Sequence, residues 1–245
     1  MMTEQEQALL RDNIARVKAR AAEAAVRAGR RPEEITLVAA TKMNSAERVR
    51  FAVENGITVC GENRVQELME KYEQSSYGDA DLQFIGTLQT NKVKYLIGKV
   101  SLIQSVGSLR LAQAINKEAA KHGIRQNVLL EVNIGKESAK SGFLPEELLE
   151  ALEKMPGFGN LSVRGLMAIP PALPHKGNNL YYFHEMHQLF IDISTKKYDN
   201  VCMACLSMGM TNDFEDAISC GSTMIRVGTA IFGARDYGKP VQGIV

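Results

Sequence analysis

Cysteine is scarce in this sequence, and neither sign of charge dominates. Four cysteines occur in 245 residues, far fewer than in small secreted domains held by disulfides, so a disulfide framework is excluded and a reducing compartment is expected. Lys and Arg number 29 against 28 Asp and Glu, which leaves a formal net charge of +1. No long-range field therefore favours nucleic acid, an anionic membrane or an acidic partner.

Long apolar segments are missing as well. The first 29 residues carry charges throughout, so they lack the apolar centre of a signal peptide, and no later run is long enough to span a membrane. We expect a cytoplasmic protein that binds neither membranes nor nucleic acid.

Metal-binding patterns are also absent. Cys202 and Cys205 form a C-x-x-C on a predicted strand, where a separation of three residues places side chains on opposite faces. They are expected to be buried thiols rather than zinc ligands or a redox pair. His184 and His187 stand at i and i+3 on a predicted helix, whereas the H-E-x-x-H zinc motif needs i and i+4. We therefore predict no metal site.

The sequence does contain a regular alternation of strands and helices. Residues 3–29 predict one long helix, because apolar residues recur at helical spacing and Gly29 provides a stop. The following strands are continuous apolar runs, as expected for a parallel sheet buried on both faces. They are predicted at Ile35–Lys42, Ile57–Glu62, Leu82–Gly86, Ser101–Val106, Asn127–Ile134, Ser162–Ile169, Val201–Met208 and Met224–Ile231, with helices around Arg64–Glu73, Asn91–Ile97, Leu109–His122, Pro145–Met155, Leu180–Lys196 and Asp213–Cys220.

Eight such units in 245 residues favour a single (β/α)8 TIM barrel, whose typical length is roughly 250 residues. The predicted domain covers residues 1–245, with the extra N-terminal helix before a barrel at about 35–235. The loosest stretch, Pro170–Asn179, is predicted to be a mobile loop beside the barrel mouth. An open doubly wound sheet is the alternative, but no G-x-G-x-x-G follows the first strand.

Lys42 is the first candidate functional residue, because reactive groups of such barrels lie at the carboxyl ends of the strands. It ends VAATK, where apolar walls would lower the pKa of its amine toward the neutral form that imine chemistry needs. The alternative is a strand-end lysine whose ammonium reaches water.

Two glycine-containing turns follow the last two strands, the place where many barrels bind phosphate. Gly209 and Gly228 would let the backbone approach an anion, while Ser207 and Thr229 offer hydroxyl donors. Taken singly, these residues are also typical of ordinary turns. Arg226 shares a strand face with Gly228 and would point inward, either to a ligand or to a structural ion pair.

Seven motifs, in order, carry a resemblance to a known family. They are VAATK, GENRVQE, FIGTLQTNKVK, VLLEVNIGKESAKSGF, GLMAIPP, LSMGMTND and GSTMIRVGTAIFGAR. Together they resemble the YggS/PROSC family of pyridoxal phosphate homeostasis proteins, from about Ile35 to Arg235. One departure is Thr87, where the family usually has histidine, so any role of that histidine is not carried over.

The resemblance implies a barrel of the alanine racemase N-terminal domain type that holds pyridoxal 5'-phosphate (PLP) as a Schiff base on Lys42. It further implies that Arg226 faces the pyridine nitrogen, which weakens the ring as an electron sink because arginine stays protonated. The remaining implied cofactor contacts are phosphate binding by Ser207, Gly228 and Thr229, a ring neighbour in Asn63, and ring faces lined by Met167 and Met208.

Three functions remain open at this point. A carrier that stores PLP and delivers it to apo-enzymes is preferred, because we find no second acid/base group for a racemase. A PLP-dependent amino-acid racemase is the first alternative. The second is an aldolase in which Lys42 attacks a carbonyl substrate and the loops after the last strands hold the substrate's phosphate. We expect a monomer.

Overall fold

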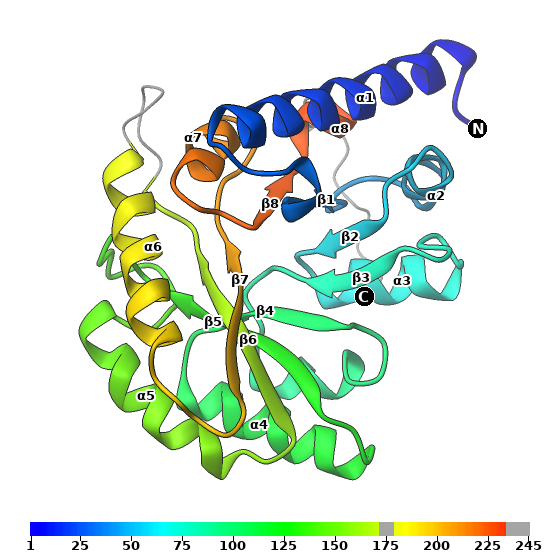
Figure 1. Cartoon of the computed structure of the whole chain (residues 1–245). Helices are drawn as coiled ribbons and strands as arrows, with labels where there is room; N and C mark the ends of the chain where they lie inside the picture. The colour runs from blue at the N-terminus through cyan, green and yellow to red at the C-terminus, as the bar shows by residue number, and fades with distance from the viewer. Residues whose placement is uncertain (172–178, 234–245) are drawn as a thin grey trace.

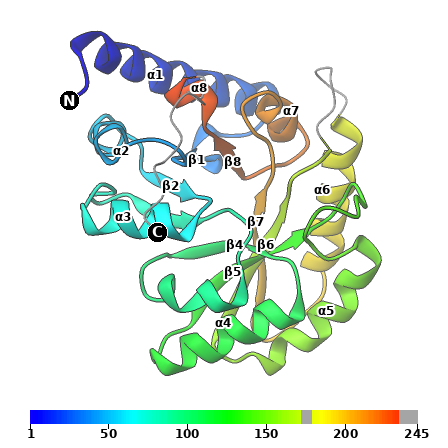
Figure 2. The same ribbon diagram turned by 180° about the vertical axis from the view of Figure 1, so that it is seen from behind.

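The structure, a computed structural model, describes residues 1–171 and 179–233. Eight parallel strands follow one another around a closed barrel, and β8 completes the circle by pairing with β1 from Thr36–Met224 to Ala39–Val227. Helices surround this barrel (Figures 1 and 2). The predicted (β/α)8 barrel with an extra N-terminal helix is thereby confirmed, and the open doubly wound sheet is wrong.

The strands are four to eight residues long, and most of their residues outside β7 are buried. They are β1 Thr36–Ala40, β2 Val59–Glu62, β3 Asp81–Phe84, β4 Leu102–Val106, β5 Gln126–Val132, β6 Leu161–Ala168, β7 Val201–Ser207 and β8 Met224–Val227. The α-helices are α1 Glu4–Arg27, α2 Ala46–Glu54, α3 Val65–Glu73, α4 Leu109–Lys121, α5 Leu148–Lys154, α6 Leu180–Ser194, α7 Phe214–Ser219 and α8 Thr229–Phe232, and short 3-10 helices are η1 Pro32–Glu34, η2 Thr90–Tyr95, η3 Pro145–Glu147 and η4 Met155–Gly157.

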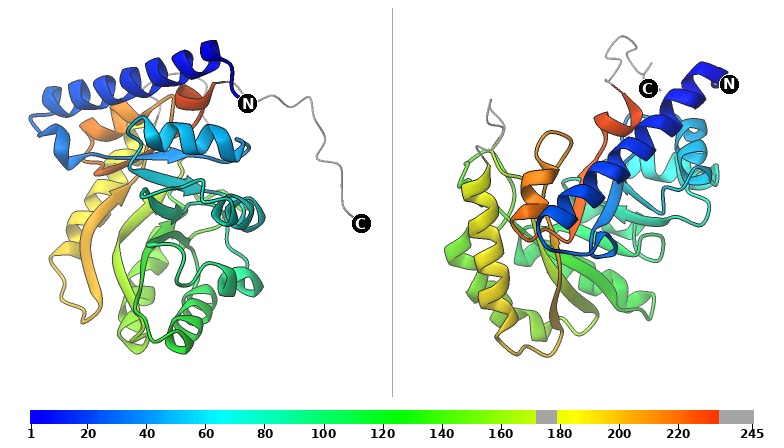
Figure 3. Two further views of the ribbon diagram at one scale, coloured as in Figure 1. Left: turned by 90° about the vertical axis from the view of Figure 1, so that its right-hand side faces the viewer. Right: turned by 45° about the horizontal axis from the view of Figure 1, so that its top comes forward.

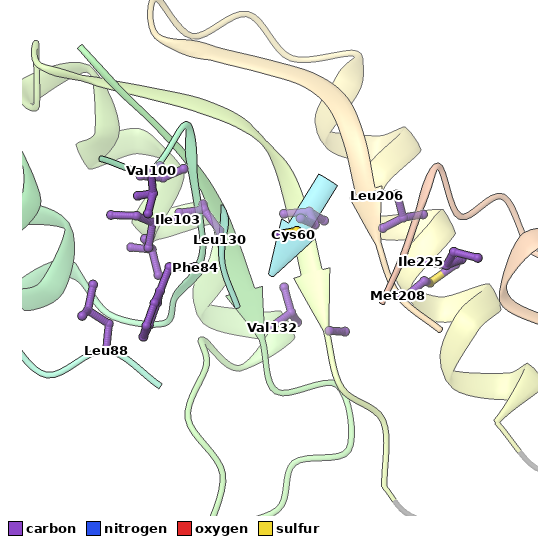
Figure 4. Packing of buried hydrophobic residues seen from close by; sticks show 14 of the residues in the cluster. Cys60, Phe84, Leu88, Val100, Ile103, Leu130, Val132, Leu206, Met208 and Ile225 are labelled. Carbon is purple, nitrogen blue, oxygen red and sulfur yellow. The ribbon is translucent and has the colours of Figure 1, made fainter. Parts of the chain in front are cut away.

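The barrel wall separates two hydrophobic cores. Along β1, Val38 and Ala40 belong to a small cluster inside the barrel, whereas Ala39 belongs to the large cluster that packs between strands and helices. This alternation follows from the two-residue period of a strand. Figure 4 shows part of the large cluster. Polar side chains share the interior with the small cluster, among them the buried Gln83 and Gln104.

Helix α1 is fixed at both ends by its sequence. Thr3 and Glu6 form a capping box at its start, and Gly29 ends it in the left-handed region with φ of +69°. Its apolar face packs on α7 and α8, and Asn13 Nδ2 donates to the Ile231 carbonyl over 3.0 Å. Figure 3 shows α1 lying across this side of the barrel, where it belongs to the outer ring of helices.

Element ends differ from the prediction in three places that matter. β1 ends at Ala40, so Lys42 lies in a turn beyond the strand. β8 ends at Val227, and the residues expected to continue it form α8. The helix expected at Asn91–Ile97 is the 3-10 helix η2.

One further sequence prediction is wrong, and two others stay untested. Cys202 is exposed rather than buried, because β7 slips by two residues against β6 before Cys205 and its first half is only partly covered. Residues 172–178 and 234–245 lie outside the described residues, so the mobile loop at 170–179 and the single domain over 1–245 stay predictions.

Candidate functional site

A cavity of about 460 Å³ opens at the carboxyl ends of β1, β6, β7 and β8. Four of the sequence-predicted residues, Lys42, Arg226, Gly228 and Thr229, line it together. Its other lining residues among those described are Ala40, Lys140, Ile169, Pro170, Pro171, Asn179, Met210, Thr211, Asn212 and Asp213. Ile169 and the two prolines give the cavity an apolar wall, as is usual for sites that hold an aromatic ligand.

Lys42 reaches this cavity from a tight turn. Thr41 N donates a hydrogen bond to the Gly61 carbonyl over 2.9 Å, and Asn44 N donates one to the Thr41 carbonyl over 3.2 Å. Met43 has a φ of +59°, a conformation that L residues rarely adopt outside turns. The turn therefore fixes the direction of the Lys42 side chain at a point where the strand has already ended.

The adjoining wall is built from the loops after β7 and β8. A methyl group on Gly228 would lie 3.2 Å from the Ala40 carbonyl oxygen, so a side chain there would crowd the cavity floor. Thr211 Oγ1 accepts a hydrogen bond from Ala230 N over 3.4 Å, which joins the two loops. Thr211 and Thr229 therefore bring hydroxyl groups to the wall beside Gly228.

Gly209 serves a different purpose from the one expected. Its φ is +92°, and an added methyl group would lie 2.5 Å from the Ala217 side chain on α7. Glycine is needed here because the loop turns sharply against that helix, and Gly209 does not line the cavity.

Ser207 lies below the cavity, in the barrel interior. Its side chain is fully buried, and Oγ donates to Gln104 Oε1 over 2.7 Å while accepting from Arg226 Nη1 over 2.6 Å. Because this hydroxyl already has two partners and is shielded from the cavity, Thr211 is better placed to meet a ligand than Ser207.

Arg226 is buried and hydrogen-bonded on two sides. Besides Ser207, it donates from Nη2 to the Ala168 carbonyl over 2.9 Å. Burial lowers the pKa of Arg226 to about 10, against the opposing effect of the carboxylates Glu131 and Asp213. The guanidinium is therefore protonated at neutral pH, and the structural ion pair considered from the sequence is replaced by neutral acceptors.

The three softer predictions lie away from the cavity. Met208 points outward into the large hydrophobic cluster beside Ile225 (Figure 4), and Met167 is fully buried in the interior cluster. Asn63 follows β2 and is not among the residues that line the cavity. No group of metal-ligating side chains is found in residues 1–171 and 179–233, and no helix in those ranges is long and apolar enough to cross a membrane.

Comparison with known proteins identifies the family. The model for the alanine racemase N-terminal domain matches residues 7–236. A pyridoxal phosphate homeostasis protein of Aquifex aeolicus is 44% identical over 92% of this chain and 98% of its own. This chain belongs to the pyridoxal phosphate homeostasis protein family. A structure of an unknown protein from Bifidobacterium adolescentis is 33% identical with a TM-score of 0.89, covering 95% of this chain and 98% of that one.

Another structural relative was solved with a ligand. PipY of Synechococcus elongatus PCC7942, with PLP bound, is 27% identical and has a TM-score of 0.79, covering 91% of this chain and 100% of that one. A protein of this fold, described as a COG0325 family member, has thus been observed with the cofactor.

Thr87, the departure from the family pattern, borders a second cavity of about 180 Å³. This side cavity shares Lys140 and Ile169 with the main one. It also contains the buried Glu131, whose carboxylate accepts from Ser141 Oγ over 3.0 Å. Burial raises the pKa of Glu131, and Ser141 and Arg226 oppose the shift.

Three of the lining residues that were not predicted from the sequence carry groups able to bind a ligand. Lys140 donates to the carbonyls of Ile169 and Pro170 and pairs with Glu137, and Asp213 and Thr211 line the β7 side. The sequence could have pointed to them, because Lys140 lies in ESAKSGF and the other two lie in LSMGMTND, and both stretches belong to motifs that carry the family resemblance. Their placement depends on loop geometry, which strand periodicity does not predict.

Proposed function

We propose that this chain binds one PLP in the main cavity and acts in PLP homeostasis, as a protein that stores the cofactor and delivers it. The observation that carries the proposal is that Lys42 lines the same 460 Å³ cavity as the Thr211, Gly228 and Thr229 wall. One molecule with an aldehyde and a phosphate would engage both sides.

The residues present suit this cofactor. Thr211 and Thr229 offer hydroxyl donors to a phosphate, and Gly228 keeps the wall clear of a side chain. Ile169 and Pro170 provide apolar contact for a ring, and Arg226 presents a buried cation to it. When bound, the cofactor supplies an aldehyde for Lys42 and a ring that can accept electrons.

Arg226 supports the carrier over a catalyst. A protonated guanidinium can donate hydrogen bonds but cannot accept one. If it is the partner of the pyridine nitrogen, that nitrogen must accept the hydrogen bond and therefore carries no proton. The ring then withdraws electrons less strongly than a protonated ring, and we expect amino-acid chemistry at the site to be slow. The same residue helps to bind the ring without promoting turnover.

The racemase alternative gains one argument from the structure. Lys140 and Asp213 line the cavity together with Lys42, so groups able to move a proton are present that the sequence did not reveal. Measurable interconversion of L- and D-amino acids by the purified protein, abolished in Lys140→Met, would favour the racemase over the carrier.

The decisive experiment is the visible spectrum and the mass of the protein, with added PLP, after borohydride reduction. A Schiff base on Lys42 is expected to give a visible band that reduction abolishes and a cofactor-sized mass increase on the peptide containing Lys42. Lys42→Ala should lose both, while Lys140→Met, which alters the other amine of the cavity, should keep them. A protein that stays colourless with PLP would contradict the proposal. The aldolase hypothesis, which needs no PLP, would then be preferred.

The setting of this function is also proposed. We place the protein in the cytoplasm as a monomer, with PLP-dependent apo-enzymes as the recipients. Transfer of PLP from the loaded protein to an apo-enzyme faster than spontaneous release into buffer would support this, and release-limited transfer would contradict it.

A further inference from the structure

The turn that carries Lys42 is held by a buried cluster behind the barrel wall. Thr41 Oγ1 donates to Glu62 Oε1 over 2.7 Å, and Met43 N donates to Glu67 Oε2 over 2.7 Å. The residues on either side of Lys42 are thus each hydrogen-bonded to a different carboxylate, one at the end of β2 and one on α3.

Lys71 joins these two carboxylates. From α3, its Nζ forms a buried ion pair with Glu62 Oε1 and lies 3.7 Å from Glu67 Oε2. The same ammonium donates to the Thr41 carbonyl over 2.8 Å. Lys71 and Glu62 are 5% and 0% exposed, so their ion pair is shielded from solvent screening, whereas Glu67 is partly exposed.

Besides Glu67, two uncharged side chains, Tyr77 and Cys60, interact with the pair. Tyr77 lies in the turn before β3, and its hydroxyl donates to Glu62 Oε1 over 3.3 Å. Burial raises the pKa of Tyr77, with the Glu62 charge adding to the shift. Burial likewise raises the pKa of the Cys60 thiol to about 12. Both side chains therefore stay protonated at neutral pH.

A buried ion pair contributes little net stability compared with apolar residues of the same volume. What this pair does provide is direction, because both of its members hydrogen-bond to Thr41, the residue before Lys42. We propose that Lys71 is a positioning residue for Lys42: by bridging Glu62 and Glu67, it fixes Thr41 and Met43 and so aims the Lys42 amine into the cavity.

This inference rests on the proposed function, in which the unprotonated Lys42 nitrogen attacks the aldehyde carbon of PLP. One C=N bond forms and the aldehyde oxygen leaves as water, so no further reactant is needed. Such attack depends on the direction of the amine, and a misplacement of about 1 Å can reduce a rate by roughly a hundredfold. Lys71 therefore affects this step without touching the cofactor.

The test compares covalent with non-covalent binding in the full-length protein. The double variant Glu62→Gln/Lys71→Met removes both charges together, which avoids leaving one charge buried alone. Its rate constant for forming the visible adduct with PLP should fall by about tenfold or more. Its affinity for 4-deoxypyridoxine 5'-phosphate, which has a methyl group in place of the aldehyde, should stay at the wild-type value. Lys71→Arg should restore part of the rate.

A matched control separates positioning from general weakening. Leu152→Ala, in the fully buried core on α5, should lower the melting temperature and leave the adduct rate unchanged. A folded double variant that reacts at the wild-type rate would overturn the proposal, as would equal losses with both ligands. If the double variant does not fold, Glu67→Ala replaces it as the test, because it removes the acceptor of Met43 N at a partly exposed position. An adduct rate for Glu67→Ala equal to that of the wild type would also overturn the proposal.

Failure of the proposed function gives a different result. In that case the wild-type protein forms no adduct, or forms one that survives Lys42→Ala, before any Lys71 variant is measured.

Discussion

The two walls of the cavity hold their functional groups by different means. On the β1 side, a reactive side chain is aimed by other side chains, through the buried carboxylate Glu62 and the ammonium of Lys71. On the β7 and β8 side, loops bring hydroxyl groups next to Gly228, where there is no side chain. A covalent bond requires one direction of approach, whereas a phosphate accepts donors from many. We therefore expect substitutions on the first wall to change rates and those on the second to change affinities.

Gly228→Val should give the largest change in affinity. Its first added carbon would lie 3.2 Å from the Ala40 carbonyl oxygen, and its methyl groups would take the place of the phosphate. Loss of hydrogen bonds to a charged group costs about 2 kcal/mol, or roughly thirtyfold in affinity. Titration with PLP and with pyridoxal, which lacks the phosphate, measures the effect, and only PLP should bind more weakly.

The control for this variant is Gly157→Ala, where an added methyl group meets open space. It should leave both affinities unchanged. Equal losses for PLP and pyridoxal in Gly228→Val would mean that the glycine shapes the whole cavity, and the contrast between the two walls would then be wrong.

Thr211→Val and Ser207→Ala separate the hydroxyl found in the cavity from the one expected from the sequence. Removing a hydroxyl that donates to phosphate should weaken PLP binding by about 1 kcal/mol, or roughly fivefold, and we expect this for Thr211→Val. Ser207→Ala removes a partner of Arg226 and should move the visible band of the bound cofactor while keeping the preference for PLP over pyridoxal. If instead Ser207→Ala weakened PLP binding and Thr211→Val did not, Ser207 would be the residue that binds the phosphate, as the sequence predicted.

Glu131→Gln should give the smallest change, in stability alone. Because burial raises the pKa of Glu131, the folded state favours its neutral form, and the associated stability is present below the ordinary value of 4.5 and lost as pH rises through the folded-state pKa. At neutral pH, Glu131→Gln should therefore melt a few degrees higher than the wild type. Thermal melting from neutral to acidic pH should show this gap closing, and a constant gap would contradict the explanation.

The barrel could be predicted from the sequence because each strand is a continuous apolar run followed by a helical pattern. Strand ends were less certain, since Thr41 and Lys42 extend an apolar run although the chain turns after Ala40. The same limit applies to β8, where Thr229 to Ile231 read as strand but form α8. Local periodicity contains no information on where a turn begins.

The site was predicted in part for a related reason. Lys42, Arg226, Gly228 and Thr229 stand out by position or motif, and the fold brings them together. Met208 was assigned to the cavity by resemblance, although strand alternation directs it outward once Ser207 points inward. Lys71 was not predicted, because a lysine on a helix normally faces water and its burial depends on Glu62, nine residues away.

Helix α1 has a consequence for how the chain folds. Its contacts on α7 and α8 join residues 4–27 to residues 214–232, and contacts so far apart in the sequence form slowly, so this part of the barrel closes late in folding. Until then, η1 and α2 cover only part of the apolar face of α1, and a partly folded chain exposes the remainder to aggregation. Thr229, on α8, therefore takes its place in the cavity lining late in folding.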